Sequence, residues 1–159
     1  YENVVILQTF SKAWGMANIR LGKAFSNTQI IDLLNKVKPP YNISELTQKA
    51  ALLAFKHRDK VREAVATILR ERSRLEDNLT RYDFVEEVYP SDANFILVKV
   101  TAPNKLYDFL AAKGIVVRNR STVTLCEGCL RLTIGQPKEN DELLAAMKEW
   151  EAVRLEATT

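Results

Sequence analysis

The sequence contains little of what marks several common classes of protein. Its 159 residues include one histidine and two cysteines, and a structural zinc site takes four such ligands. No apolar run approaches the roughly 20 residues that a membrane-spanning helix needs, and no signal-peptide pattern opens the chain. Its 23 Lys and Arg against 20 Asp and Glu, a net charge of +3, are too balanced to indicate a nucleic-acid partner. We therefore expect a soluble, cytoplasmic protein that binds no metal, nucleic acid or membrane.

The two cysteines, Cys126 and Cys129, stand in the short run CEGC. A redox CxxC motif normally opens a helix after a strand, whereas Cys129 begins the strand-like run CLRLTI. The only histidine, His57, lies far away in a charged helical pattern. The sequence therefore predicts structural cysteines.

The length and the start of the chain indicate a fragment. With 47% hydrophobic residues, the chain is long enough for one core of ordinary size or for two small lobes. It runs from Tyr1 straight into the apolar residues 4–10, with no earlier strand for pairing. Because a single buried strand cannot stand alone, we expect further chain upstream. No internal repeat or low-complexity segment appears.

A lysine directly follows the first predicted strand. Residues 4–10, VVILQTF, are β-branched and aromatic and predict a buried strand, after which Lys12 follows. The carboxyl ends of strands form the ligand crevice of open α/β sheets. Thr9 and Ser11 add hydroxyls and Arg20 adds a guanidinium fork, a donor set suited to phosphate, while a lysine amine can condense with an aldehyde. Pyridoxal 5′-phosphate carries both an aldehyde and a phosphate. The alternative is a solvated lysine on a loop.

Capping residues delimit the helices of the first half. Asn27 and Ser44 are N-cap candidates, and the pair Pro39–Pro40 ends the first helix. The charged run before residue 79 reads as the solvated face of an amphipathic helix rather than as a nucleic-acid patch. The predicted elements are strand 19–25, helix 27–38, a helix opened by Ser44, and a helical pattern over 46–79 with a break near His57.

The second half alternates between strands and helices and predicts an α+β sheet that helices cover on one side. Gly114 supplies a C-cap, and Pro137 can open the last helix. The predicted elements are strand 93–100, helix 104–114, strand 115–118, strand 129–134 and a final helix from about 139 to 155.

Two arginines in this half indicate an anion site. Arg118 closes one predicted strand, and Arg131 lies between Leu130 and Leu132 in another. Burial of a guanidinium without an anionic partner is costly. On adjacent strands the two forks could converge on one carboxylate or phosphate. Taken singly, each arginine also fits a surface position.

Three motifs carry a resemblance to a known family. The run SKAWGMANIRLG (11–22) closely resembles the cofactor-lysine signature of fold-type I pyridoxal-phosphate aminotransferases. With NKVKPPYNISELTQ (35–48) and GIVVRNRSTVTLCEGCLRLTIG (114–135), the chain is similar to the C-terminal portion of histidinol-phosphate aminotransferases. The resemblance covers essentially the whole chain.

The resemblance implies the C-terminal part of a fold-type I large domain (α/β) followed by a small α+β domain. Residues 1–56 would be the remnant of the cofactor-binding domain, 57–81 a long connecting helix and 82–159 the small domain. It also implies a homodimer when full-length, with histidinol phosphate and glutamate or 2-oxoglutarate as substrates in histidine biosynthesis.

Roles for single residues follow from the same resemblance. Lys12 would hold pyridoxal 5′-phosphate and move the substrate proton, while Thr9, Ser11 and Arg20 would anchor the cofactor phosphate. The family also uses an aspartate, a tyrosine and an asparagine upstream of the lysine. This chain lacks them, so alone it should be inactive or nearly so.

The substrate's anionic group would meet Arg131, and Arg118 would assist with the substrate phosphate. Two alternatives stay open. One is a related fold-type I enzyme, such as an aromatic aminotransferase or an amino-acid decarboxylase of the cobalamin-pathway type. The other is a non-catalytic dimerisation or binding module with an incidental lysine.

Overall fold

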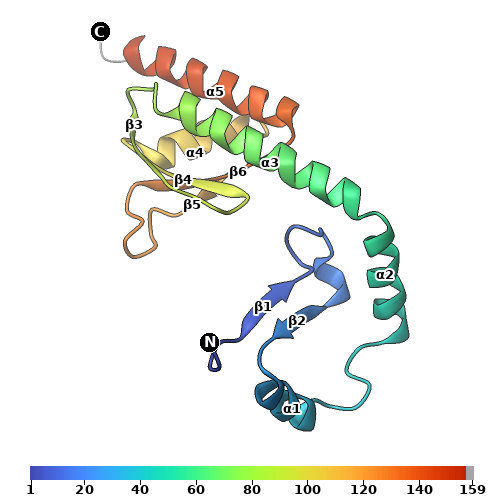
Figure 1. The fold of residues 1–159 in the computed structure, drawn as a ribbon. Coiled ribbons are helices and arrows are strands. Elements are labelled where there is room, and N and C mark those ends of the chain that lie inside the picture. The colour runs from blue at the N-terminus through green and yellow to red at the C-terminus, as the bar shows by residue number, and fades with distance from the viewer. Residues whose placement is uncertain (157–159) are drawn as a thin grey trace. The chain divides into compact units, whose positions relative to one another are not determined.

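The computed structural model describes residues 1–156, which fall into two compact units. Unit 1 is Tyr1–Val65, and unit 2 begins at Ala66, within one long helix (Figure 1). Each unit is described by itself. Within the described residues, no helix combines the length and the apolar character that crossing a membrane requires.

Unit 1 is built on a two-stranded antiparallel ribbon. Strand β1 (Ile6–Thr9) pairs with β2 (Gly22–Phe25), and Thr9 faces Gly22 in the register. A short 3-10 helix, η1 (Ala17–Ile19), lies in the connection between the strands. Three helices follow: α1 (Thr28–Val37), α2 (Glu45–Lys56) and the first turns of α3 (Arg58–Leu79).

Two expectations for this ribbon were wrong. The apolar run 4–10 predicts a buried strand, but all four residues of β1 are exposed, because a two-stranded ribbon has no packed layer against either face. Residues 19–21 are not part of the second strand. Arg20 instead caps η1 in the left-handed region, with a φ of 51°.

The capping predictions for the helices are confirmed. The Asn27 side chain accepts a hydrogen bond from the backbone N–H of Ile30 at 2.9 Å, and Ser44 accepts one from Thr47 at 3.1 Å. The predicted break near His57 is also confirmed, since α2 ends at Lys56 and α3 begins at Arg58.

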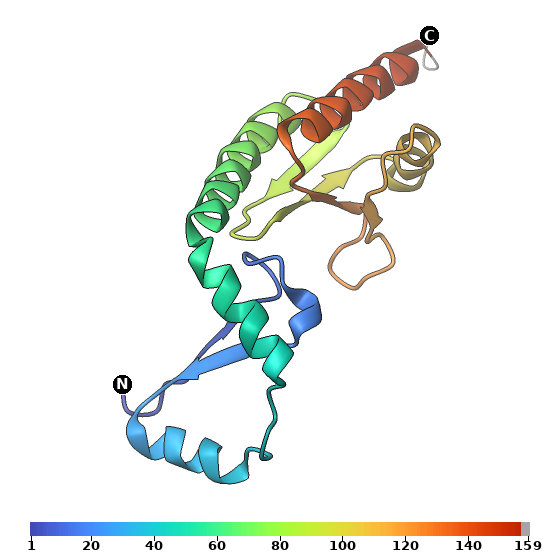
Figure 2. The ribbon, with the colours of Figure 1, turned by 90° about the vertical axis from the view of Figure 1, so that its right-hand side faces the viewer.

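Unit 2 contains a four-stranded antiparallel sheet in the order β3-β4-β6-β5. Its strands are β3 (Val85–Tyr89), β4 (Phe95–Val100), β5 (Arg118–Asn119) and β6 (Cys129–Thr133). The segment between β5 and β6 forms a loop that extends from the sheet (Figure 2).

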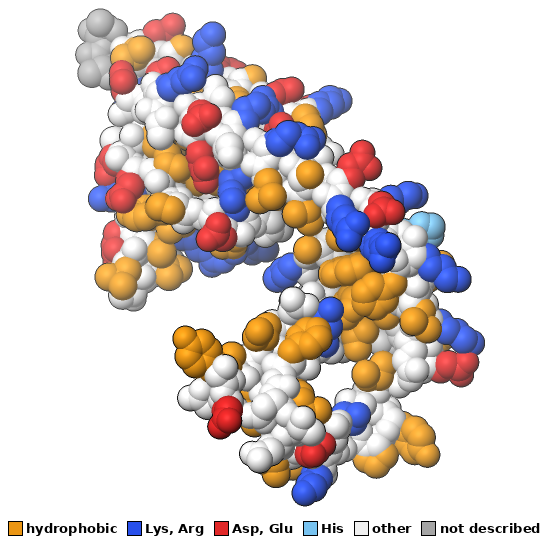
Figure 3. All heavy atoms as spheres, in the orientation of Figure 1, with side chains coloured by type: hydrophobic (Ala, Val, Ile, Leu, Met, Phe, Trp, Pro, Cys, Tyr) orange, Lys and Arg blue, Asp and Glu red, His pale blue; other side chains and the backbone are white. Residues whose placement is uncertain are grey.

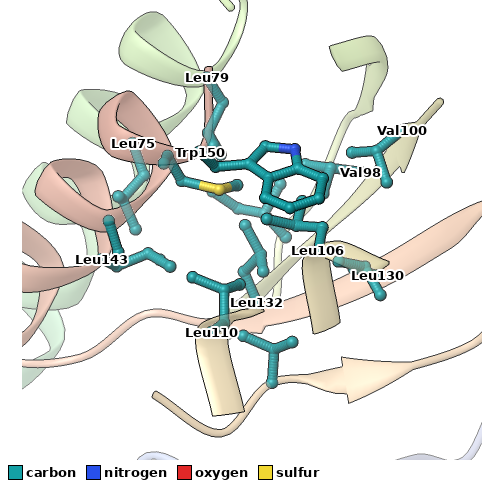
Figure 4. Packing of buried hydrophobic residues seen from close by; sticks show 14 of the residues in the cluster. Leu75, Leu79, Val98, Val100, Leu106, Leu110, Leu130, Leu132, Leu143 and Trp150 are labelled. Atoms are coloured by element: carbon teal, nitrogen blue, oxygen red, sulfur yellow. The ribbon is translucent and has the colours of Figure 1, made fainter. Parts of the chain in front are cut away.

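One face of this sheet packs against helices, as predicted. Alternate residues of β4 are buried (Ile96, Val98 and Val100). They join one apolar core with side chains from α3, α4 (Pro103–Ala112) and α5 (Pro137–Glu156), as Figure 4 shows. Trp150 of α5 contributes the largest ring in the labelled part of this core. The opposite face carries the residues that alternate with the buried ones.

The strand predicted over 115–118 is wrong for its first three residues. Gly114 has a φ of +78°, and the N–H of Ile115 donates to the Leu110 carbonyl at 2.9 Å. This bond, with that from Gly114 to Ala111, forms a Schellman end to α4 and holds the segment away from the sheet. Only Arg118 and Asn119 pair as a strand.

Strand β3 has no counterpart among the sequence predictions. Its pairing with β4 shifts between Val85 and Glu87, which marks a bulge or similar irregularity. An extra residue interrupts the alternation of apolar and polar side chains on which strand prediction depends. The last helix begins at Pro137, two residues earlier than its predicted start, and Pro occupies its first position as expected.

Candidate functional site

The predicted cofactor lysine lies in a loop whose base is closed by backbone hydrogen bonds. The N–H of Phe10 donates to Leu21 at 3.2 Å, which extends the β1–β2 ladder by one step, and the N–H of Met16 donates to Phe10 at 2.9 Å. The Lys12 carbonyl accepts from Gly15 at 2.8 Å, and Gly15 has a φ of +64°. Lys12 therefore begins a tight turn that glycine permits.

Three aromatic rings anchor this loop on both sides of the lysine. Phe10 is buried and Trp14 is half-buried, and each packs against Phe55 of α2. Ring centroids lie 5.4 Å apart for Phe10–Trp14, 5.6 Å for Phe10–Phe55 and 5.0 Å for Trp14–Phe55. These separations are typical of favourable aromatic pairs. The backbone is thus held two residues before and two residues after Lys12, whose own side chain is exposed.

The donors predicted for a phosphate gather at the same loop. The Thr9 hydroxyl oxygen accepts the Ser11 N–H at 3.0 Å, which leaves the hydroxyl hydrogen of Thr9 free to donate. Arg20 is exposed and donates one hydrogen bond, to the Ala17 carbonyl at 3.1 Å. No ion pair in the described part of the chain involves Lys12 or Arg20.

This donor set fits pyridoxal 5′-phosphate. An amine without a carboxylate partner suits condensation with an aldehyde, and hydroxyls with a guanidinium fork suit a phosphate. Arg20 adopts its left-handed conformation without the freedom of glycine, which costs about 1–2 kcal/mol. Backbone strain of this kind clusters at ligand sites, where the surrounding structure maintains it.

The second predicted pair lies in unit 2. Arg118 of β5 faces Arg131 of β6 directly in the strand register, so the prediction that the two arginines lie on adjacent strands is confirmed. Like charges directly opposite one another destabilise a sheet. Neither arginine forms an ion pair within residues 1–156. The two guanidiniums therefore offer forked donors that suit an anion.

Arg131 carries a buried donor without an acceptor in the described structure. Its neighbours Leu130 and Leu132 are buried in the core, so Arg131 lies on the opposite face of the sheet. Its Nε is buried and has no hydrogen-bond partner in the described structure. Its guanidinium carbon lies 4.9 Å from the centroid of the Phe95 ring. A buried N–H without an acceptor is costly, so an incoming anion would relieve this cost.

A buried polar network holds the turn that follows β6. The Asn140 side chain is almost fully buried, accepts the Gly135 N–H at 2.9 Å and donates to the Gly135 carbonyl at 3.0 Å. It also donates to the Glu71 carboxylate at 2.8 Å, which accepts a second bond from Arg74 at 2.7 Å. The hydrogen bonds from Arg74 and then Asn140 lower the pKa of Glu71. The strand that carries Arg131 is thereby tied to α3.

The two cysteines belong to neither of the two groups of predicted site residues. Cys129 is buried and Cys126 is half-buried, and both are free thiols. Burial raises the pKa of the Cys129 thiol, which disfavours a reactive thiolate. Among residues 1–156, no group of three or more His, Cys, Asp or Glu side chains could hold a metal ion.

The structure thus brings Thr9, Ser11, Lys12 and Arg20 to one loop of unit 1 and places Arg118 beside Arg131 in unit 2. The sequence analysis did not identify two aromatic residues beside these groups. Phe55 packs against the loop that carries Lys12, and Phe95 packs against Arg131. The signal for Phe95 was available in part, since it alternates with the buried residues of a predicted strand. Which residue of β6 it meets depends on the register between two strands far apart in sequence.

Comparison with known proteins identifies the family of the chain. The model of the family "Aminotransferase class I and II" matches residues 1–147. A histidinol-phosphate aminotransferase of Parabacteroides distasonis is 55% identical over 148 residues, which are 93% of this chain and 43% of the relative. The chain thus spans less than half the length of this curated relative.

Solved structures give the same picture. A histidinol-phosphate aminotransferase from Clostridium acetobutylicum superposes with a TM-score of 0.82 at 28% identity, over 96% of this chain and 47% of that one. A histidinol-phosphate aminotransferase from Sinorhizobium meliloti in complex with pyridoxal-5′-phosphate superposes with a TM-score of 0.74 at 26% identity, over 96% of this chain and 42% of that one. The chain therefore has the fold of a part of these enzymes.

Proposed function

The chain belongs to the class I and II aminotransferase family, and from this premise we propose that it serves a pyridoxal-phosphate-dependent transaminase. In an enzyme of its relatives' full length, it would help move an amino group between histidinol phosphate and 2-oxoglutarate or glutamate. The name of the relative at 55% identity supports the substrate. The observation that carries the proposal is Lys12, an unpaired amine in an anchored turn beside phosphate donors.

Within this proposal Lys12 has two tasks. Its amine would hold the cofactor and, when free, would move the proton of the substrate carbon that bears the amino group. Thr9, Ser11 and Arg20 would hold the cofactor phosphate through hydroxyl and guanidinium donors. When bound, pyridoxal 5′-phosphate supplies the electron sink for bond breaking at that carbon.

The arginine pair takes the substrate anion in this proposal. The orphaned Nε of Arg131 and the facing Arg118 support it, since together they offer two forks and no internal counter-ion. The proposal keeps residues 1–56 with the cofactor-binding domain, 57–81 as the connecting helix and 82–159 as the small domain. We expect the chain alone to be inactive or nearly so.

A homodimer is part of the proposal for the full-length enzyme. Unit 1 exposes many large apolar side chains, and Figure 3 shows hydrophobic groups gathered over α2. Extended exposed apolar surface marks contact with further protein. We assign this surface to the rest of the enzyme and a second copy. Sedimentation equilibrium of the full-length enzyme tests this assignment, and a monomer would contradict it. In the helices of unit 1, the most exposed large apolar residues are Leu33, Val37, Leu46, Leu52 and Leu53.

The decisive test is covalent mapping of the cofactor in the full-length enzyme. Borohydride reduction followed by peptide mapping should place the cofactor on the peptide that contains Lys12. Lys12→Ala should abolish both this label and the visible absorbance of the bound cofactor, while Lys36→Ala, at an exposed position of α1, should change neither. A label on another lysine would overturn the proposal. Carbon dioxide released from an amino-acid substrate would indicate a decarboxylase instead.

A further inference from the structure

Phe95 lies under the guanidinium of Arg131 on the sheet face that the helices leave uncovered. In the β4–β6 register, Leu97 faces Arg131 and Phe95 faces Thr133, so Phe95 is the diagonal neighbour of Arg131 on the same face. Diagonal neighbours on paired strands are within reach when one side chain is aromatic and the other is long. The distance of 4.9 Å from the guanidinium carbon to the ring centroid is that of a cation–π contact.

Phe95 is not needed for the core of unit 2. Its neighbour Ile96 is fully buried among the helices, whereas Phe95 is half-buried and belongs neither to the core cluster nor to the side chains packed against it. No carboxylate fixes Arg131, and its Nε has no acceptor in the described structure. Among the interactions described for Arg131, the ring contact is therefore the one that can orient the plane of its guanidinium.

We propose that Phe95 is a positioning residue for Arg131, holding the guanidinium plane so that its N–H fork points to the anionic group of the substrate. A ring contacts the face of the guanidinium and leaves its edge donors free. A carboxylate in the same place would consume those donors. This inference rests on the proposed function, in which Arg131 binds the substrate anion.

The test compares two variants of Phe95 in the full-length holoenzyme. Phe95→Leu keeps an apolar side chain but removes the ring, and it should raise the KM for histidinol phosphate and for 2-oxoglutarate by about 3- to 30-fold, the range of cation–π energies. The kcat should stay within a few-fold, because the chemistry at Lys12 is untouched. Phe95→Tyr keeps the ring and should restore most of the affinity. If Phe95→Leu does not fold, Phe95→Met takes its place.

A matched control exists in the same unit. Phe109 of α4 also lies under a cation, with Lys113 Nζ at 5.0 Å from its ring centroid, and it packs on Trp150. Phe109→Leu removes the same kind of contact on the helix side. It should lower the melting temperature at least as much as Phe95→Leu, yet leave both KM values unchanged. An equal rise in KM for both variants would reduce Phe95 to a structural role and overturn the inference.

Coupling to Arg131 separates this inference from the proposed function. In an Arg131→Ala background, Phe95→Leu should add no further rise in KM, since the group it positions is gone. Fully additive effects would overturn the inference. A rise in KM for Arg131→Ala with none for Phe95→Leu would refute the role of Phe95 and leave the role of Arg131 intact. No change in KM for Arg131→Ala would refute both roles. Calorimetric titration of the holoenzyme with inorganic phosphate, as a stand-in for the anion, should give the same order of affinities.

Discussion

The ring of Phe55 on α2 meets the ring of Phe10 edge-on, at 5.6 Å between centroids and 88° between planes. Phe10 stands two residues before Lys12, so a helix later in the chain fixes the start of the lysine turn. The contact links the packing of unit 1 to the position of the proposed cofactor amine.

Loss of this contact should weaken cofactor binding. Phe55→Leu removes the edge-on pairs with Phe10 and Trp14, each worth about 0.5–1.5 kcal/mol beyond burial. The looser turn should raise the dissociation constant for pyridoxal phosphate about 3- to 30-fold, measured by equilibrium dialysis of the full-length enzyme. Lys49→Ala, at an exposed polar position of the same helix, should leave that constant unchanged. Equal affinity for Phe55→Leu and the parent enzyme would refute the anchoring role.

The affinity for the cofactor should depend on the forked donors of the Arg20 guanidinium and not only on its positive charge. Arg20→Ala should weaken cofactor binding by about 2–4 kcal/mol, because a phosphate loses its forked partner. Arg20→Lys should recover only part of this loss, since an ammonium is a point charge without the fork. Both variants keep a non-glycine residue at a φ of 51°, so backbone strain does not distinguish them. Identical cofactor affinities for all three enzymes, again by equilibrium dialysis, would contradict the phosphate assignment.

The hydrogen bonds to Glu71 should make the free energy of unfolding fall as the pH is lowered. Arg74 and Asn140 lower the folded-state pKa of Glu71, so its ionised form stabilises the fold at pH values above the unfolded pKa of about 4.3. This contribution is lost as the pH falls through the folded-state pKa. Glu71→Gln should cost about 1–3 kcal/mol at pH 7, and the gap to the parent enzyme should shrink towards low pH.

Thermal melting of the full-length enzyme between pH 7 and pH 3.5 measures this gap. Glu63→Gln, at an exposed position on the same helix, is the control and should melt like the parent enzyme throughout. A gap for Glu71→Gln that stays constant with pH would show that lost packing, rather than ionisation, causes the destabilisation.

Sequence patterns predicted the local features of the fold well. The caps at Asn27 and Ser44, the break at His57 and the Gly114 end of α4 all depend on residues within one or two turns. Because local hydrogen bonds decide these features, a single sequence is enough to find them. The adjacency of the strands that carry Arg118 and Arg131 followed from their order along the chain.

Features that depend on tertiary contacts were harder to predict. The bulge near Val85 hides β3, because its extra residue breaks the alternating pattern. Residues 115–117 are apolar enough for a strand, yet the hydrogen bond from the Ile115 N–H to the Leu110 carbonyl holds them at the end of α4. The contact of Phe95 with Arg131, 36 residues later in the chain, needs the β4–β6 register. For this reason the sequence indicated the two arginines but not the ring that packs against one of them.

Arg131 and Arg118 should divide the work of accepting two substrates. Under the proposed function, one site accepts anions of different shape, because histidinol phosphate offers a phosphate and no carboxylate, whereas glutamate offers two carboxylates. Arg131 is half-buried over Phe95 and Arg118 is exposed, although they face one another in the register. The enclosed arginine suits whichever anion arrives, and the exposed one suits the extra charge and oxygen of a phosphate.

Single-turnover measurement of each half-reaction in the full-length enzyme tests this division. Arg131→Ala should impair both half-reactions by about 2–4 kcal/mol in apparent transition-state binding, as expected for a partly buried, charge-assisted contact. Arg118→Ala should raise the KM mainly for histidinol phosphate and leave the glutamate half-reaction within a few-fold. Arg81→Ala, an exposed arginine of the same unit, should change neither. Equal losses with both substrates for Arg118→Ala would show that the two arginines act as one undivided site, because a residue reserved for phosphate has no reason to weaken glutamate.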